Sequence, residues 1–191
     1  MALGIAARRD AARQEILRAC WELAAEHGLA GFTLRQVAAA IGIRAPSLYS
    51  YFAAKNDMYD AMFRQGAEAF ATAVAAVPAY SAPRKRLRAA ARAFLEFCVA
   101  DPVRYQLLFQ RTLPGFTPTA EAYAPAVAAY RHMESAFAEV GVTRQRDLDL
   151  WTALLTGLAS QQLANDPGGT RWTRLAGDAA DMFADHVLGE I

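Results

Sequence analysis

Residues 32–55 read FTLRQVAAAIGIRAPSLYSYFAAK. Gln36 follows Thr33 at the spacing of a capping box, in which the threonine hydroxyl caps the start of a helix and the glutamine reaches back to the backbone. Apolar residues then recur at helical spacing until Gly42, a residue type that commonly ends helices. The sequence therefore predicts a short helix over residues 33–41.

A second short helix is expected directly after the first. Pro46 stands in the first turn of the segment Arg44–Tyr51, where the missing N–H of proline costs little. Two short helices joined by a tight turn form a helix-turn-helix, whose second helix is free to enter the major groove of DNA. The outward side of this unit carries more polar and aromatic residues than a core needs: Arg35, Gln36, Arg44, Ala45, Pro46, Ser47, Tyr49, Ser50, Tyr51 and Lys55.

The charge of the chain indicates that any binding to nucleic acid is local. The formal net charge is +1, which excludes the simplest signal for a nucleic-acid-binding protein, a strongly basic chain. From His27 to Asn56 there is no Asp or Glu, whereas Arg35, Arg44 and Lys55 are present. This window is either a surface for phosphates or a helical surface of small residues that happens to lack carboxylates.

The composition predicts a globular, all-α chain. Apolar residues make up 54% and charged residues 20% of the 191 residues, enough to bury a sizeable core. Alanine dominates, β-branched runs are scarce, and apolar residues recur at three and four, which indicates about nine helices. We expect them over about 11–27, 33–41, 44–51, 55–77, 83–100, 102–113, 118–140, 143–165 and 171–188, with Asp101 capping the sixth and Thr143 the eighth.

Two domains are expected, with their boundary near Gly66. We predict a flexible N-terminal arm at residues 1–10, a helix-turn-helix DNA-binding domain at 11–65, and a helical ligand-binding and dimerisation domain at 66–191. The two arginines of the arm either enter a minor groove or belong to an uninvolved tail.

Other functional classes find little support in the sequence. The chain begins without the apolar core of a signal peptide, and no stretch approaches the roughly 18 apolar residues of a membrane span, so we expect a cytoplasmic protein without membrane contact. Cys20 and Cys98 lie far apart in apolar patterns and are expected to be buried thiols. The motifs of common hydrolases, nucleotide-binding proteins and metalloproteases are absent, and the three histidines fall on separate predicted helices. We therefore expect no catalysis, no metal and no cofactor.

The segment from about Ile16 to Tyr59 resembles the tetracycline-repressor family. The resemblance rests on Gly-Ile-x-x-x-Ser-Leu-Tyr-x-Tyr-Phe-x-x-Lys at residues 42–55, which is a specific signature, together with the preceding FTLRQVAAAI. It implies a DNA-binding transcriptional regulator. Ala45 and Pro46 replace a Lys-Gly pair that is frequent in the family, which removes a basic contact and leaves small apolar surface suited to a thymine methyl group.

The resemblance also implies two kinds of contact to double-stranded DNA. Phosphate contacts, which set position without reading sequence, fall to the hydroxyl-bearing and cationic residues Thr33, Tyr49, Tyr51 and Lys55. Base contacts, which select the operator sequence, fall to the residues that match the front of the reading helix and its neighbour: Arg35, Arg44, Ala45, Pro46, Ser47 and Ser50.

The last two long helices are predicted to form a homodimer interface. A single three-helix reading head makes few contacts, so such proteins usually bind as twofold dimers. The predicted eighth helix is apolar nearly all round and must bury two sides, one against its own core and one against a partner; the alternative is a monomer with a central eighth helix. The predicted interface residues are Leu150, Leu154, Leu158, Gln162, Trp172, Leu175, Ala179, Phe183 and Val187.

The middle helices are rich in aromatic residues and are a candidate for a small-molecule pocket. The alternative is a plain core. The predicted lining residues are Phe94, Phe97, Tyr105, Phe109, Tyr123, Tyr130, Met133 and Trp151. Asp101-Pro-x-x-Tyr-x-Leu-x-Phe, followed by Leu150-Trp-x-x-Leu-x-x-Gly, resembles the WHG type of regulatory domain, although Thr156-Gly157 stands where that type usually has His-Gly.

Taken with the resemblance, these features predict a repressor. It binds a palindromic operator as a homodimer and is released by a small apolar or aromatic effector that changes the spacing of its two reading heads. The alternative is a helical small-molecule-binding or adaptor protein without DNA binding.

Overall fold

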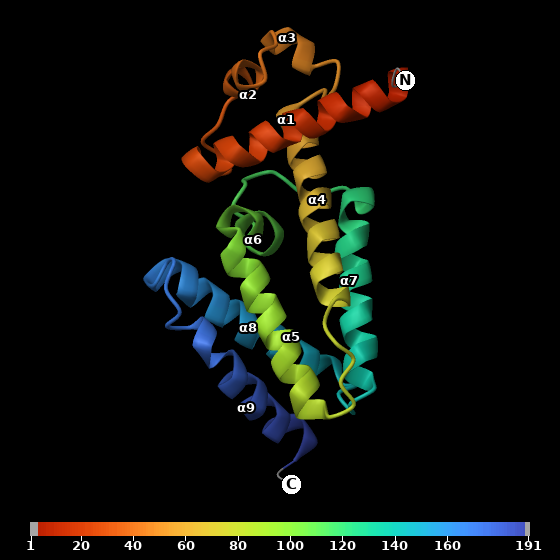
Figure 1. Ribbon diagram of the computed structural model, residues 1–191, viewed down its shortest axis with the longest axis vertical. Helices are drawn as coiled ribbons and strands as arrows, with labels where there is room; N and C mark the ends of the chain where they lie inside the picture. The colour runs from red at the N-terminus through yellow and green to blue at the C-terminus, as the bar shows by residue number, and fades with distance from the viewer. Residues whose placement is uncertain (1–3, 190–191) are drawn as a thin grey trace.

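The computed structural model describes residues 4–189, and these residues fold into α-helices with no strand among them (Figure 1). The predicted all-α fold is confirmed. The elements of this part of the chain are α1 (Ile5–His27), α2 (Leu34–Ala40), α3 (Ala45–Leu48), α4 (Lys55–Ala75), α5 (Pro83–Ala100), α6 (Pro102–Phe109), α7 (Ala120–Ala138), α8 (Gln145–Asn165), the 3-10 helix η1 (Thr173–Leu175) and α9 (Ala176–Leu188).

The helices form a small head and a larger body (Figure 1). In the head, α2 and α3 lie on the far side of α1 from the body. Helix α4 begins beneath α1 and runs down into the body, where it packs along α7. Helices α5, α8 and α9 pack on one another at the opposite end of the molecule. The arrangement makes α4 the long connection between the two parts.

Two helix starts form as the sequence predicts. The backbone N–H of Gln36 donates to Thr33 Oγ1 at 3.3 Å, and the N–H of Thr33 donates to Gln36 Oε1 at 2.8 Å, which completes the capping box of α2. Asp101 Oδ1 accepts from the N–H of Arg104 at 2.9 Å, with Pro102 at the first position of α6. These short patterns fix where α2 and α6 begin.

Several predicted boundaries are wrong. Helix α1 begins at Ile5, six residues early, because the alanines and arginines of residues 6–9 are strong helix formers. The predicted flexible arm is therefore helical over residues 5–10, and its residues 1–3 lie outside the described part. Arg144, not Thr143, precedes α8, and no side chain caps that helix. The last helical segment opens with the 3-10 turn η1 before α9.

Two clusters of buried side chains make up the core. The first joins α1, α2, α3 and α4, and it extends into the body through Leu107, Leu113 and Ala122. The second lies within the body, around the contact of Phe137 with Trp151. The head therefore shares its core with the part of the body next to it. Within residues 4–189, no helix combines the length and hydropathy that a bilayer crossing requires.

Candidate nucleic-acid interface

Buried apolar side chains hold α2 and α3 together, and the other side of the two helices, called here the open side, is exposed. Val37 and Leu48 are fully buried and Ala38 nearly so, while Phe52 closes the core after α3. Helix α3 spans only four residues, which is shorter than the predicted Arg44–Tyr51; the chain leaves it in turns at residues 49–51. The predicted helix-turn-helix is thus present, with a reading helix of little more than one turn.

Most of the predicted DNA-contacting residues lie on the open side. Tyr49 is the clearest case, since this large aromatic residue is 57% exposed. Ala45, Tyr51 and Lys55 are half-buried. The exposed members of the predicted set are Thr33, Arg35, Arg44, Pro46, Ser47, Tyr49 and Ser50.

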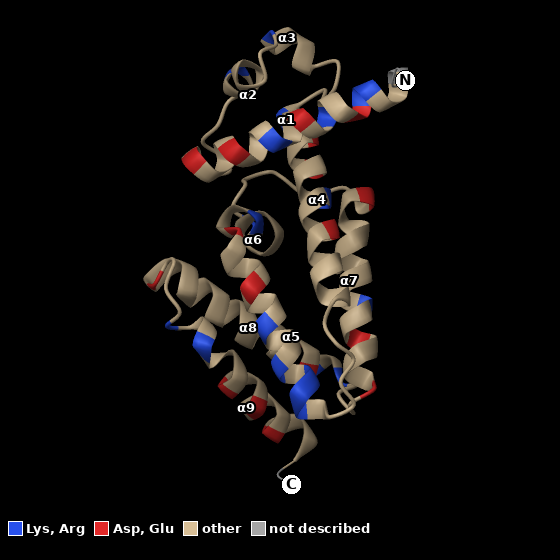
Figure 2. Ribbon diagram, in the orientation of Figure 1, with Lys and Arg blue, Asp and Glu red and all other residues tan. Residues whose placement is uncertain are grey.

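The open side carries positive charge without compensating carboxylates. Figure 2 shows arginine but no Asp or Glu on α2 and just before α3. Within residues 4–189, neither Arg35 nor Arg44 takes part in an ion pair. Both guanidinium groups are exposed and available to an external anion.

Lys55 takes a position that the sequence did not indicate. Its ammonium donates to the carbonyl oxygen of Phe32 at 2.6 Å and to that of Ala30 at 3.4 Å. It also stands over the rings of Phe32 and Tyr59, 4.3 Å and 5.2 Å from their centres. Burial lowers the pKa of this ammonium. Lys55 therefore joins the first turn of α4 to the loop before α2.

A tight turn places Thr33 above the end of α1. A Cβ atom on Gly31 would stand 2.0 Å from the carbonyl oxygen of His27, so no side chain fits there. The N–H of Gly31 donates to the carbonyl of Gly28 at 3.0 Å. This closure brings residues 30–32 within reach of Lys55 and sets the start of α2.

Two arginines of α1 contact the turn that follows α3, and neither contact was predicted from the sequence. Arg9 donates to the carbonyl oxygen of Ser50 at 3.0 Å, and Arg13 donates to that of Tyr51. The Arg13 guanidinium also lies over the Phe52 ring, 4.1 Å from its centre. Their spacing of four residues on one face of a helix was the available signal. They bring positive charge to the end of α3, where helix carbonyls point outward.

The body contains an apolar chamber of about 400 Å³ between α4, α5, α6, α7 and α8. Six of the eight predicted pocket residues line it: Phe94, Phe109, Tyr123, Tyr130, Met133 and Trp151. The other two do not. Tyr105 is buried with its hydroxyl donating to the carbonyl of Thr156 at 3.3 Å. Phe97 lies instead on a surface groove of about 610 Å³ between the end of α4 and α5.

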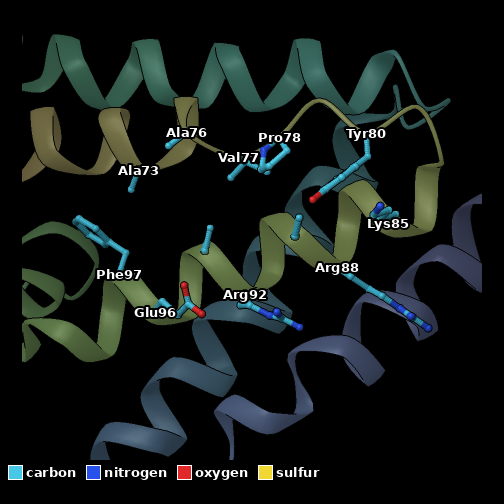
Figure 3. A pocket seen from close by; sticks show the side chains of 12 residues that line it. Ala73, Ala76, Val77, Pro78, Tyr80, Lys85, Arg88, Arg92, Glu96 and Phe97 are labelled. Atoms are coloured by element: carbon cyan, nitrogen blue, oxygen red, sulfur yellow. The ribbon is translucent and has the colours of Figure 1, made fainter.

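Figure 3 shows this groove. Ala73, Ala76, Val77 and Pro78 face it from α4 and the chain that follows, while Lys85, Arg88 and Arg92 extend from α5. Two of its cationic side chains already have contacts within the chain. Arg88 forms a two-point ion pair with Asp181 of α9, at 2.5 and 2.7 Å, and Lys85 lies 4.2 Å from the centre of the Tyr80 ring.

The predicted interface residues divide into two groups. Leu150 is 42% exposed, and Leu154, Leu158, Trp172, Leu175 and Val187 are half-buried, so they are accessible to a partner. Ala179, Phe183 and Gln162 are buried within the chain. Gln162 Oε1 accepts from the N–H groups of Trp172 and Thr173 at 2.9 and 3.2 Å, which ties α8 to the start of η1. These hydrogen bonds to the loop account for a polar residue on an otherwise apolar face of α8.

Comparison with known proteins finds a family whose sequence pattern matches the head. Residues 16–62 match the family described as bacterial regulatory proteins, tetR family. The helix-turn-helix head of the chain is thus similar to the DNA-binding heads of that family. The match covers α2 and α3 and most of α1, together with the part of α4 that begins at Lys55.

Other similar proteins extend the likeness into the body. The chain is 30% identical over 103 residues to the HTH-type transcriptional activator FasR of Mycolicibacterium smegmatis. That alignment covers 53% of this chain and 47% of FasR, so the chain spans about half the length of this curated relative. The protein SCO4313 has the same fold, with a TM-score of 0.78 at 22% identity over 95% of this chain and 98% of that one. The multidrug binding protein EbrR, in complex with imidazole, gives 0.63 at 27% identity over 90% and 88%.

Proposed function

We propose that the protein is a transcriptional regulator that binds double-stranded DNA through α2 and α3. The observation that carries the proposal is the open side of these helices, where Tyr49, Arg35 and Arg44 are exposed and no carboxylate lies within the sequence window 28–55. A surface of this kind suits phosphates and base edges and has no internal use. The match of residues 16–62 to the tetR family supports the same function.

The proposed contacts divide by chemistry. Thr33, Tyr49 and Tyr51 bring hydroxyl groups to phosphates, and Lys55 adds positive charge behind them. Arg35, Arg44, Ser47 and Ser50 meet base edges, with Ala45 and Pro46 against apolar groups in the groove. Ser50 now donates to the carbonyl of Ser47 at 2.7 Å, so a base contact requires its hydroxyl to rotate.

Recognition of an operator requires a second copy of the chain. We propose a homodimer built on the accessible side of α8, where Leu150, Ala153, Leu154, Gly157 and Leu158 recur at helical spacing. Two reading heads related by a twofold axis match a palindromic operator. The accessible part of α9 and η1 continues the same interface through Trp172, Leu175 and Val187.

We propose that the apolar chamber binds the effector that controls DNA binding. An effector that binds there contacts α4 directly, because Phe63, Ala67 and Phe70 of α4 line the chamber. We propose that the effector favours a different spacing of the heads and releases the operator. The sign of regulation proposed is repression, although FasR is named an activator. The name of EbrR as a multidrug binding protein supports a chamber that accepts small molecules.

The proposal is tested by selecting bound duplexes from a random-sequence DNA library with the wild-type protein. We expect a palindromic consensus and a complex of one dimer with one duplex, measured by analytical ultracentrifugation. The variant Tyr49→Phe removes one hydroxyl and should weaken binding to every sequence alike, whereas Arg44→Ala should relax the consensus at particular positions. A library without enrichment would favour the alternative, a small-molecule-binding protein that does not bind DNA.

A further inference from the structure

A second hollow adjoins the apolar chamber at the surface. It has a volume of about 520 Å³ and lies between α6, the loop 110–119 and the start of α7. Four side chains line both spaces: Phe63, Leu108, Phe109 and Tyr123. Tyr123 stacks on Phe63 with 5.8 Å between ring centres and is 49% exposed. These four side chains form the partition between the outer hollow and the chamber.

The chamber and the outer hollow differ in chemistry. The chamber lining has no charged side chain, and two of its hydroxyl groups already have partners within the chain. Tyr130 accepts from the Gln145 amide at 2.6 Å, and Thr152 donates to the carbonyl of Leu148 at 2.9 Å. Burying a charge in such a lining is costly. The chamber therefore suits an apolar group and not an ion.

The outer hollow contains one charged side chain, Arg111. It is exposed, and within residues 4–189 it takes part in no ion pair. The hydroxyls of Thr112 and Thr117 line the same hollow. An unpaired guanidinium beside two hydroxyls is suited to a carboxylate.

We propose that the effector is a monoanionic amphipathic molecule, an organic carboxylate with an apolar tail, and that it enters through the outer hollow. Its tail lies in the chamber, past Phe63 and Tyr123, and its carboxylate pairs with Arg111. This inference rests on the proposed function, since it gives a chemical class to the effector. The basic groove of Figure 3 does not serve the same ligand, because it shares no lining residue with the chamber.

The experiment compares two probes that differ in the head group alone, decanoate and 1-decanol. Binding is followed by the fluorescence of Trp151, which lines the chamber, with Trp21 and Trp172 replaced by Phe to isolate the signal. The wild type should bind decanoate more tightly than decanol. Arg111→Gln should weaken decanoate roughly threefold to tenfold and leave decanol unchanged, and Arg111→Lys should keep most of the preference. Arg131→Gln is the matched control, since Arg131 is exposed on α7 and lines neither space.

The second part of the experiment fills the chamber with a larger side chain. Val127→Phe adds bulk at the lining without adding a tryptophan and should abolish binding of both probes, and retention of the wild-type melting temperature shows that the variant folds. Equal affinities of the wild type for the two probes, or an unchanged decanoate affinity in Arg111→Gln, would overturn the inference. Operator binding by the ligand-free protein is measured separately, so a failure of the carboxylate assignment is distinguishable from a failure of the regulator proposal.

Discussion

The ammonium of Lys55 lies 2.6 Å from the carbonyl oxygen of Phe32 and 4.3 Å from the centre of the Phe32 ring. The contact joins the first residue of α4 to the residue just before the cap of α2. Helix α4 continues from this point to the chamber, where its side chains form part of the wall. We therefore expect a displacement of α4 in the body to reach the start of the helix-turn-helix.

Replacing Lys55 should lower stability as well as DNA affinity. Lys55→Met removes two charged hydrogen bonds and two cation–ring contacts at a half-buried position, and we expect a loss of about 2 kcal/mol in the free energy of unfolding. Urea unfolding measures this loss. Lys85→Met is the control, because Lys85 is exposed and has one ring contact, to Tyr80. If Lys55 serves phosphates alone, the two variants will unfold at the same urea concentration.

Arg13 should act on DNA binding through the position of the reading segment. Arg13→Gln loses the contact with the Tyr51 carbonyl and with the Phe52 ring. We expect operator affinity to fall about tenfold, equivalent to roughly 1.4 kcal/mol, because residues 49–51 lose their support. Arg18→Gln, which removes an exposed pair with Glu22 on the same helix, should leave affinity unchanged. Fluorescence anisotropy with labelled operator gives both values, and equal affinities of the two variants would refute the positioning role.

The sequence predicted the parts of the fold that are encoded locally. Thr33 with Gln36, and Asp101 with Pro102, start helices through contacts within four residues, so their patterns are legible in the chain itself. The internal contacts of Lys55, Arg9 and Arg13 were not predicted, because their partners lie 23 to 41 residues away. Gln162 looked like part of an apolar interface because nothing local indicates that a loop ten residues later needs its oxygen.

Gly66 permits the close approach of α4 and α6. A Cβ atom there would stand 3.2 Å from Arg104 Cγ and 3.3 Å from Leu108 Cδ2. Gly66→Ala should therefore lower the free energy of unfolding by about 1 kcal/mol, despite the higher helix propensity of alanine. Gly177→Ala in α9 meets no atom within 4 Å and should instead gain up to about 1 kcal/mol. If both variants gain free energy of unfolding, in thermal or urea unfolding, α4 and α6 accommodate the added methyl group without loss of stability.

Acid should loosen the connection between α8 and η1. The backbone N–H of Arg171, which donates to Asp166 Oδ2 at 2.8 Å, lowers the pKa of this carboxyl, and the Gln162 amide adds to the effect. Because the folded state favours the ionised form, this stabilisation is complete above the ordinary pKa of about 4 and is lost as the pH falls through the lowered value. The free energy of unfolding should therefore fall more steeply below about pH 4 for the wild type than for Asp166→Asn. Parallel curves for the two proteins would exclude a contribution from this carboxylate.

The central claim, that α2 and α3 bind DNA through their open side, is tested most directly by the affinity for the selected operator over a range of salt concentrations. The wild type should bind with a steep dependence on salt, as counterions are released from phosphates. Arg35→Ala/Arg44→Ala should lose at least about 2 kcal/mol of binding free energy on the operator while keeping its melting temperature. The control Arg131→Ala should bind as the wild type does. An unchanged operator affinity in the double variant would contradict the account.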